Sequence, residues 1–210
     1  MSDFVRALAA LILALAVGSP ARAWRDTAGG ARAAGLALAV FEARLAANPS
    51  ATQVLGTWCA EHAMASPPVI RAERDVTVDR PADADVRRML GAGPGETVRY
   101  RRVRLACGLH VLSEADNWYL PRLLTAEMNR QLGETDRPFG LVVRSLKFTR
   151  RTLEVKTLLR AAARGTARAL VLPHNVSRHR ALLLDGEGRP FSLVVETYTD
   201  AVLDFAPVSR

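Results

Sequence analysis

Hydrophobic residues follow two different spacings along the chain. In helices they recur with a period near 3.6 residues, and in half-buried strands they alternate with polar residues. Ser50 and Thr125 precede two helical segments as N-caps, and Gly133 is predicted as the C-cap of the second. The pattern predicts helices over residues 31–47, 50–64, 81–90, 125–132 and 160–169.

Strand-like alternation dominates the second half of the chain. Gly108-Leu109 separates two alternating segments, which is typical of a β-hairpin, and Asp185–Gly188 separates two more. The predicted strands cover 69–78, 97–107, 110–120, part of 145–158, 178–184 and 191–199. Helices followed mostly by hairpin strands predict an α+β fold, an antiparallel sheet with helices packed on one face.

The first 23 residues have the features of a secretory signal peptide. Arg6 precedes an apolar run over 7–18, and Ala21–Ala23 supplies an A-x-A cleavage pattern. We therefore expect a single domain over 24–210 in the bacterial periplasm or outside the cell, with no stable membrane span after cleavage. A buried or uncleaved N-terminal helix is the alternative interpretation.

The expected compartment affects how the two cysteines, Cys59 and Cys107, are interpreted. An oxidising compartment allows them to form a disulfide that closes a loop of 48 residues. Two buried thiols are the alternative, and the sequence leaves both open.

The amino-acid composition limits which kinds of partner the protein is expected to bind. The 210 residues carry a net charge of +8, and only two of the 29 basic residues are lysines, so 27 are arginines. These arginines are scattered without interleaved aromatic residues, so we expect no nucleic-acid partner. Cys59 and His62 form only a fragment of a metal motif, so no metal site and no cofactor are expected. We expect a monomer.

Charged residues inside apolar strands are the candidates for chemistry. Glu196 shares one face of the last strand with Ser192, Val194 and Tyr198. A buried carboxylate must be paired or protonated, and Arg102 lies in a similar position on another strand. The two could close a pocket together, form a structural ion pair, or lie on a solvated surface strand.

Four segments resemble the chorismate lyase family. They are YRRVRLAC at Tyr100–Cys107, Pro121, the turn Arg137–Gly140, and SLVVETY at Ser192–Tyr198. The resemblance extends over about residues 55–205. Its fold, an antiparallel sheet with helices on one face, is shared with the effector-binding domains of one group of bacterial transcription regulators.

The resemblance implies an activity and a site. Chorismate lyases convert chorismate to 4-hydroxybenzoate and pyruvate without metal or organic cofactor. Arg102 matches the arginine that binds the ring carboxylate, and Glu196 matches a glutamate at the far end of the pocket, where it could donate a proton. Phe139 and Gly140 match a turn that lines the site, and Asn117 stands where the family has a second basic residue.

Two functional hypotheses follow. The first is a lyase acting on chorismate or a related aromatic or cyclohexadienyl carboxylate, with Arg102 and Glu196 as catalytic residues and Arg180 assisting. The second is an exported binding module that captures a small acidic aromatic ligand and performs no chemistry. In both hypotheses the partner is a small aromatic carboxylate.

Overall fold

The computed structural model describes residues 29–159 and 172–205. The expected signal peptide over 1–23 and the expected helix over 160–169 lie outside the described residues. The helices are α2 (Gly30–Ala47), α3 (Ala51–Glu61), α4 (Ala84–Leu90), α5 (Ala126–Glu134) and α6 (Phe139–Val142). The strands are β1 (Ile70–Arg74), β2 (Arg99–Cys107), β3 (His110–Tyr119), β4 (Thr149–Thr157), β5 (Asn175–Leu184) and β6 (Pro190–Thr199).

The described strands form one six-stranded sheet in the order β1-β2-β3-β6-β5-β4. Every neighbouring pair is antiparallel, and the β2–β3 and β5–β6 hairpins lie where the sequence predicts them. The α+β prediction is confirmed. No helix within 29–159 or 172–205 combines the length and the apolar character that crossing a membrane requires.

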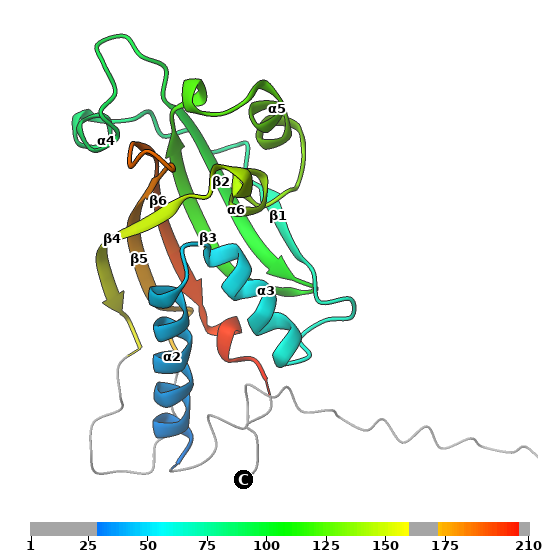
Figure 1. Ribbon diagram of the computed structural model, residues 1–210. Coiled ribbons are helices and arrows are strands. Elements are labelled where there is room, and N and C mark those ends of the chain that lie inside the picture. The colour runs from blue at the N-terminus through cyan, green and yellow to red at the C-terminus, as the bar shows by residue number, and fades with distance from the viewer. Residues whose placement is uncertain (1–28, 160–171, 206–210) are drawn as a thin grey trace, which may run out of the picture.

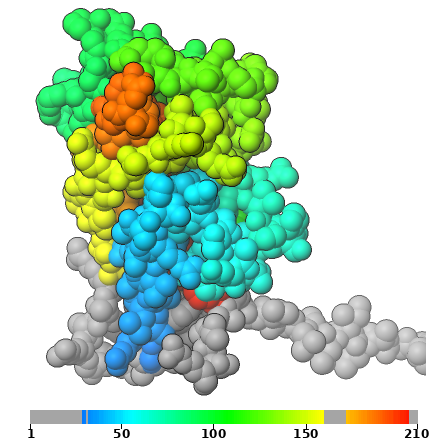
Figure 2. Space-filling model, in the orientation of Figure 1, coloured from blue at the N-terminus to red at the C-terminus, as the bar shows by residue number. Residues whose placement is uncertain are grey.

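Helices cover the two faces of the sheet unequally. The inner face packs against α2, α3, α5 and α6, and Figure 2 shows α2, α3 and the α6 segment meeting in front of the sheet. The short helix α4 instead packs on the outer face, through Val86 and Leu90 against Trp118 and Val195 (Figure 1). The expectation of helices on a single face therefore needs one correction, which is α4.

Aromatic packing and a disulfide attach the first two helices to the sheet. Phe41 of α2 makes edge contacts with Trp58 of α3 and with Tyr198 of β6, at 5.1 Å between ring centroids in each case. Cys59 of α3 is bonded to Cys107 at the end of β2, with 6.2 Å between their Cα atoms. Of the two alternatives that the sequence leaves open, the disulfide is the one present, and it connects α3 to the β2–β3 hairpin.

Two of the three predicted helix caps are present, while α3 ends at Glu61 and α4 begins at Ala84, inside their predicted ranges. Ser50 accepts a hydrogen bond from the Gln53 amide, and Thr125 caps α5 in the same way. Gly133 is not a C-cap, because α5 continues through it to Glu134. Arginine side chains donate to the carbonyls of Leu132 and Gly133, so these carbonyls need no left-handed residue to satisfy them.

Strand β1 is shorter than the predicted segment 69–78. Its pairing with β2 ends at Arg74, opposite Val103. The Asp75 carboxylate then accepts hydrogen bonds from the amide and the hydroxyl of Thr77, which closes a local turn. The first residues of β2 are therefore left without β1 beside them.

Candidate functional site

A small chamber lies between the inner face of the sheet and the ends of α3 and α6. Its volume of about 40 Å³ is room for about three water molecules. Ser50 and Thr52 at the start of α3 form its roof together with Phe139 and Gly140 of α6. The sheet contributes Arg101, Val103, Leu105, Ala115, Asn117, Arg150, Leu183, Val194 and Glu196.

Gly140 allows α6 to approach the start of α3 closely. A Cβ atom at this position would lie 2.9 Å from Ser50 Oγ and 3.0 Å from Thr52 Oγ1. Those distances are shorter than van der Waals contact, so any side chain here would push the two helices apart. The roof of the chamber therefore depends on the glycine.

Glu196 is held by an ion pair at one end of the chamber. Arg150 of β4 donates to its Oε2 at 2.5 Å, and the Tyr198 hydroxyl donates to the same oxygen at 3.1 Å. The side chains of Arg150 and Glu196 are 6% and 9% exposed. Burial alone would lower the pKa of Arg150, but the nearby Glu196 carboxylate outweighs it and raises that pKa.

Two further buried groups adjoin this pair. Burial raises the pKa of the Tyr198 phenol well above its ordinary value, and the Glu196 charge adds to the effect. His179 lies beside Glu196 on β5, and burial lowers its pKa. Its Nε2 lies 3.2 Å from the hydroxyl of Ser177, which donates to Glu42. Tyrosine and histidine are thus both held neutral near a paired carboxylate.

Asn117 presents an uncommitted donor to the chamber. Its Oδ1 accepts a 2.6 Å hydrogen bond from the Ser192 hydroxyl, which fixes the orientation of the amide. Asn117 is only 4% exposed, and among the described residues no acceptor contacts its amide nitrogen. Among the described residues this nitrogen is not one of the fully enclosed atoms that lack a partner, so it is accessible and can donate to a ligand that carries an acceptor.

Arg101 lies opposite Asn117 on the inner face and is also buried, at 7% exposure. Its Nε donates to the Leu132 carbonyl and its Nη2 donates to the Arg137 carbonyl. Within the described residues no carboxylate lies within ion-pair distance of its guanidinium. Burial and the neighbouring Arg74 charge lower the pKa of Arg101 to about 10. An anion beside Arg101 would offset both effects.

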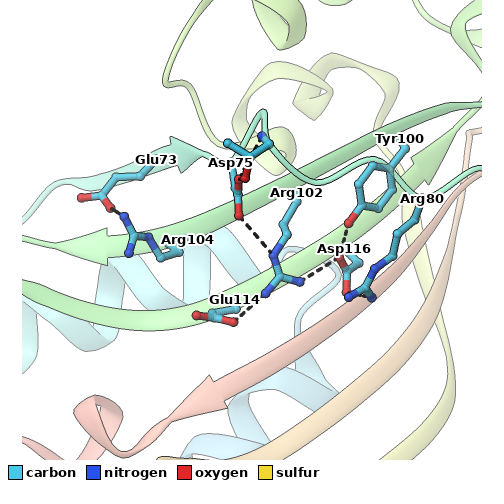
Figure 3. A network of polar contacts seen from close by, with 9 residues as sticks. Glu73, Asp75, Arg80, Tyr100, Arg102, Arg104, Glu114 and Asp116 are labelled. Atoms are coloured by element: carbon cyan, nitrogen blue, oxygen red, sulfur yellow. Dashed lines mark hydrogen bonds and ion pairs between the residues drawn. The ribbon is translucent and has the colours of Figure 1, made fainter.

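Arg102 is not in the chamber, and this corrects the expected pairing with Glu196. Its side chain lies on the outer face, where it contacts Glu114 at 2.9 Å, Asp116 at 3.1 Å and Asp75 at 3.8 Å (Figure 3). The physical reason is strand alternation, because consecutive residues of a strand face opposite sides of the sheet. The two groups are separated by the sheet.

Arg180 is likewise on the outer face. It pairs in register with Val195, and its guanidinium lies 3.8 Å from Asp85 of α4. Phe139, Gly140, Asn117 and Glu196 do line the chamber, as the resemblance implies. The expected pocket for an aromatic acid is, in this structure, a chamber with room for only a few water molecules.

Sequence reasoning missed Arg101 and Arg150. The alternation of β2 contained a signal for the first, because Arg101 has the same parity as the buried Val103 and Leu105. No comparable signal existed for Arg150, since β4 is a mostly exposed edge strand. Its place beside Glu196 depends on the β4–β5 register, which only the tertiary structure provides.

The donors and acceptors of the chamber suit a small anion better than a metal ion. Within the part of the chain that the structure describes, no three His, Cys, Asp or Glu side chains are grouped to hold a metal. Arg101 and Asn117 offer N–H groups, whereas the only carboxylate that lines the chamber, Glu196, is already paired with Arg150.

A curated relative and several solved structures are similar to this chain. No family model matches it. "Uncharacterized protein y4mC" of Sinorhizobium fredii (strain NBRC 101917 / NGR234) is 45% identical over 183 residues, which are 80% of this chain and 77% of that protein. The chain belongs to the y4mC family.

Solved structures resemble parts of this y4mC-family chain. PhnF from Mycobacterium smegmatis is 15% identical with a TM-score of 0.47, over 68% of this chain and 63% of PhnF. YydK from Bacillus subtilis is 15% identical with a TM-score of 0.42, over 67% of this chain and 62% of YydK. The chain thus spans less than two thirds of either protein. The C-terminal domain of the histidine utilization repressor from Pseudomonas syringae is 12% identical with a TM-score of 0.43, over 67% of this chain and 97% of that domain.

Proposed function

We propose that the protein is a binding module for a small carboxylic acid, whose carboxylate enters the chamber beside Arg101 and Asn117. The observation that carries the proposal is the Asn117 amide nitrogen, a donor on a chamber-lining residue that has no acceptor among the described residues. A carboxylate oxygen in the chamber would accept a hydrogen bond from it. Arg101 supplies the positive charge that the carboxylate needs.

The volume of the chamber sets the size of the ligand. About 40 Å³ accommodates a carboxylate group or an acetate-sized anion but no aromatic ring. Phe139 is the roof residue that can move aside most easily, because it belongs to α6, which is a single turn of helix. An aromatic acid would therefore bind with its carboxylate on the sheet and its ring in the place of the Phe139 side chain.

The lyase hypothesis is less well supported. Protonation of a departing oxygen requires an acid, and Glu196 is ion-paired with Arg150 and accepts a hydrogen bond from Tyr198. The arginine that the resemblance assigns to the ring carboxylate, Arg102, lies on the opposite face of the sheet. We therefore propose binding without turnover.

Calorimetric titration of the full chain tests the proposal. Acetate, benzoate and 4-hydroxybenzoate form the ligand series, and benzamide is the matched neutral control. We expect saturable binding of at least one acid and none of benzamide. Absence of acid binding, or equal binding of benzamide, would reject the module. Incubation with chorismate is expected to yield no 4-hydroxybenzoate above the uncatalysed rate, and product formation would favour the lyase instead.

We also propose that the protein works in an oxidising compartment outside the cytoplasm. The Cys59–Cys107 disulfide and the signal-like segment over 1–23 support this localisation. Fractionation of bacterial cells expressing the chain, followed by mass spectrometry, tests it. The expected species lacks the first 23 residues and contains no free thiol, whereas a full-length reduced chain in the cytoplasm would contradict the proposal.

A further inference from the structure

A second and larger cleft opens where β1 ends. Its volume is about 390 Å³, within the range of small-molecule sites. One wall is the start of β2 with Tyr119, another is the end of α5, and the third is the chain that follows β1, over 74–79. Arg101 separates this cleft from the chamber, because its side chain lines both.

Three guanidinium groups gather on one side of the cleft. Arg74, Arg99 and Arg101 share the inner-face parity of their strands and line it. Arg74 donates to the Gly133 carbonyl at the end of α5, where Arg101 also donates to a carbonyl. Arg99 is exposed, and its side chain makes no hydrogen bond or ion pair with any described residue. The cleft thus contains more positive charge than its neighbours neutralise.

The acidic residues of the cleft do not balance this charge. Asp75 faces Arg102, whose positive charge is also shared with Glu114 and Asp116. Asp79 lines the cleft but makes no ion pair within the described residues. Asp136 lies close enough to Arg101 to raise its pKa, so among the described residues Asp79 and Asp136 are the acidic groups available to three guanidinium groups.

The main chain of β2 contributes a second kind of donor. The Asp75 amide donates to the Arg102 carbonyl at 3.0 Å, and this is the last contact along that edge. Main-chain groups of alternate residues point to the same side of a strand, so those of Tyr100 also face this edge. No β1 residue stands opposite Tyr100, which leaves its N–H directed toward the cleft.

We propose that this cleft is a second binding site, for a small molecule that bears two or more carboxylate or phosphate groups. Guanidinium groups bind such oxyanions through paired hydrogen bonds, and three of them favour a polyvalent anion over a monovalent one. The ligand would span Arg99 and Arg74 at the mouth and reach Arg101 at the floor. This site does not depend on the function proposed for the chamber.

Calorimetric titration with citrate at constant ionic strength tests the second site. Wild-type protein is expected to bind one citrate, and Arg99→Gln is expected to weaken binding about tenfold by removing one charge-assisted contact. The matched control is Arg104→Gln, which removes one exposed arginine from the same strand on the outer face, where it pairs with Glu73. The control should bind citrate as the wild type does.

The outcomes separate the two sites. Asn117→Leu removes the amide from the chamber without adding a charge beside Arg101, and should leave citrate binding unchanged. Absence of saturable citrate binding by the wild type, or equal binding by wild type and Arg99→Gln, would overturn the second site. Loss of citrate binding in Asn117→Leu would also overturn it, because the anion would then be in the chamber. Failure of the chamber to bind monocarboxylic acids leaves these outcomes unaffected.

Discussion

Arg101 and Arg102 are consecutive residues of β2, and their guanidinium groups lie on opposite faces of the sheet. Arg101 is buried on the inner face and donates only to main-chain carbonyls. Arg102 is paired with Asp116 and Glu114 on the outer face. The first is therefore available to an anionic ligand, and the second stabilises the fold.

The outer-face network predicts that Arg102 matters for stability and not for binding. Arg102→Gln removes charge-assisted hydrogen bonds to the mostly buried Asp116, which keeps only Arg80 and Tyr100 as partners. We expect the free energy of unfolding to fall by about 1–2 kcal/mol. Urea denaturation measures it, with Arg104→Gln as an exposed control that should change stability by less than about 0.5 kcal/mol. Equal stability of the two variants would refute this role.

Substitution by alanine is expected to have opposite effects on stability at Gly140, in the roof of the chamber, and at Gly133, within α5. Gly140→Ala places a methyl group against Ser50 and Thr52, and should destabilise the fold by about 1–3 kcal/mol through overpacking. Gly133→Ala lies within α5 with open space around it, and should stabilise by about 0.5–1 kcal/mol. Thermal unfolding of both variants provides the comparison. A neutral Gly140→Ala would mean that α6 does not rest on the start of α3.

The disulfide predicts a large contribution to stability. Cys59 and Cys107 are separated by 48 residues, and chain-entropy arithmetic gives about 4 kcal/mol for a loop of this length. The double variant Cys59→Ala/Cys107→Ala should lose about that amount in denaturant titrations. Reductant should destabilise the wild type and leave the double variant unchanged. If reductant has no effect on the stability of the wild type, the disulfide does not contribute to the free energy of unfolding.

The half-buried His62 and the buried His179 predict a fall in stability on mild acidification. Burial lowers the pKa of both His62 and His179 below 6.5, so the unfolded chain takes up protons first as the pH falls. Stability is therefore full above pH 6.5 and declines below it, until the folded-state pKa values are reached. Melting temperatures from about pH 7.5 to about pH 5.5 should decrease, and less so in His62→Phe and His179→Gln. A flat profile in the wild type would contradict the lowered pKa values of both histidines.

Much of the fold follows from local patterns in the sequence. The caps at Ser50 and Thr125, and the hairpin at Gly108-Leu109, arise from short-range chemistry that a sequence displays directly. The prediction that Gly133 is a C-cap was wrong, because arginines from β1 and β2 donate hydrogen bonds to the carbonyls at the end of α5. That contact joins residues far apart in the chain and leaves no local trace.

The candidate site was less predictable than the fold. Glu196, Asn117, Phe139 and Gly140 line the chamber, but the sequence paired Glu196 with Arg102 instead of Arg150. A shift of one residue along a strand exchanges its two faces, so a small error of alignment moves an arginine to the opposite side of the sheet. Arg150 and Glu196 are 46 residues apart in the chain, and the pairing of the strands brings them into contact.

Carboxylate binding by Asn117→Asp tests the chamber most directly. This nearly isosteric change keeps the oxygen that accepts from Ser192 and replaces the free amide donor with negative charge. Calorimetry with the tightest acid of the series should show binding by the wild type and by Arg102→Gln, and a loss of about tenfold or more in Asn117→Asp. Undiminished binding by Asn117→Asp, or a loss confined to Arg102→Gln, would contradict the chamber as the binding site.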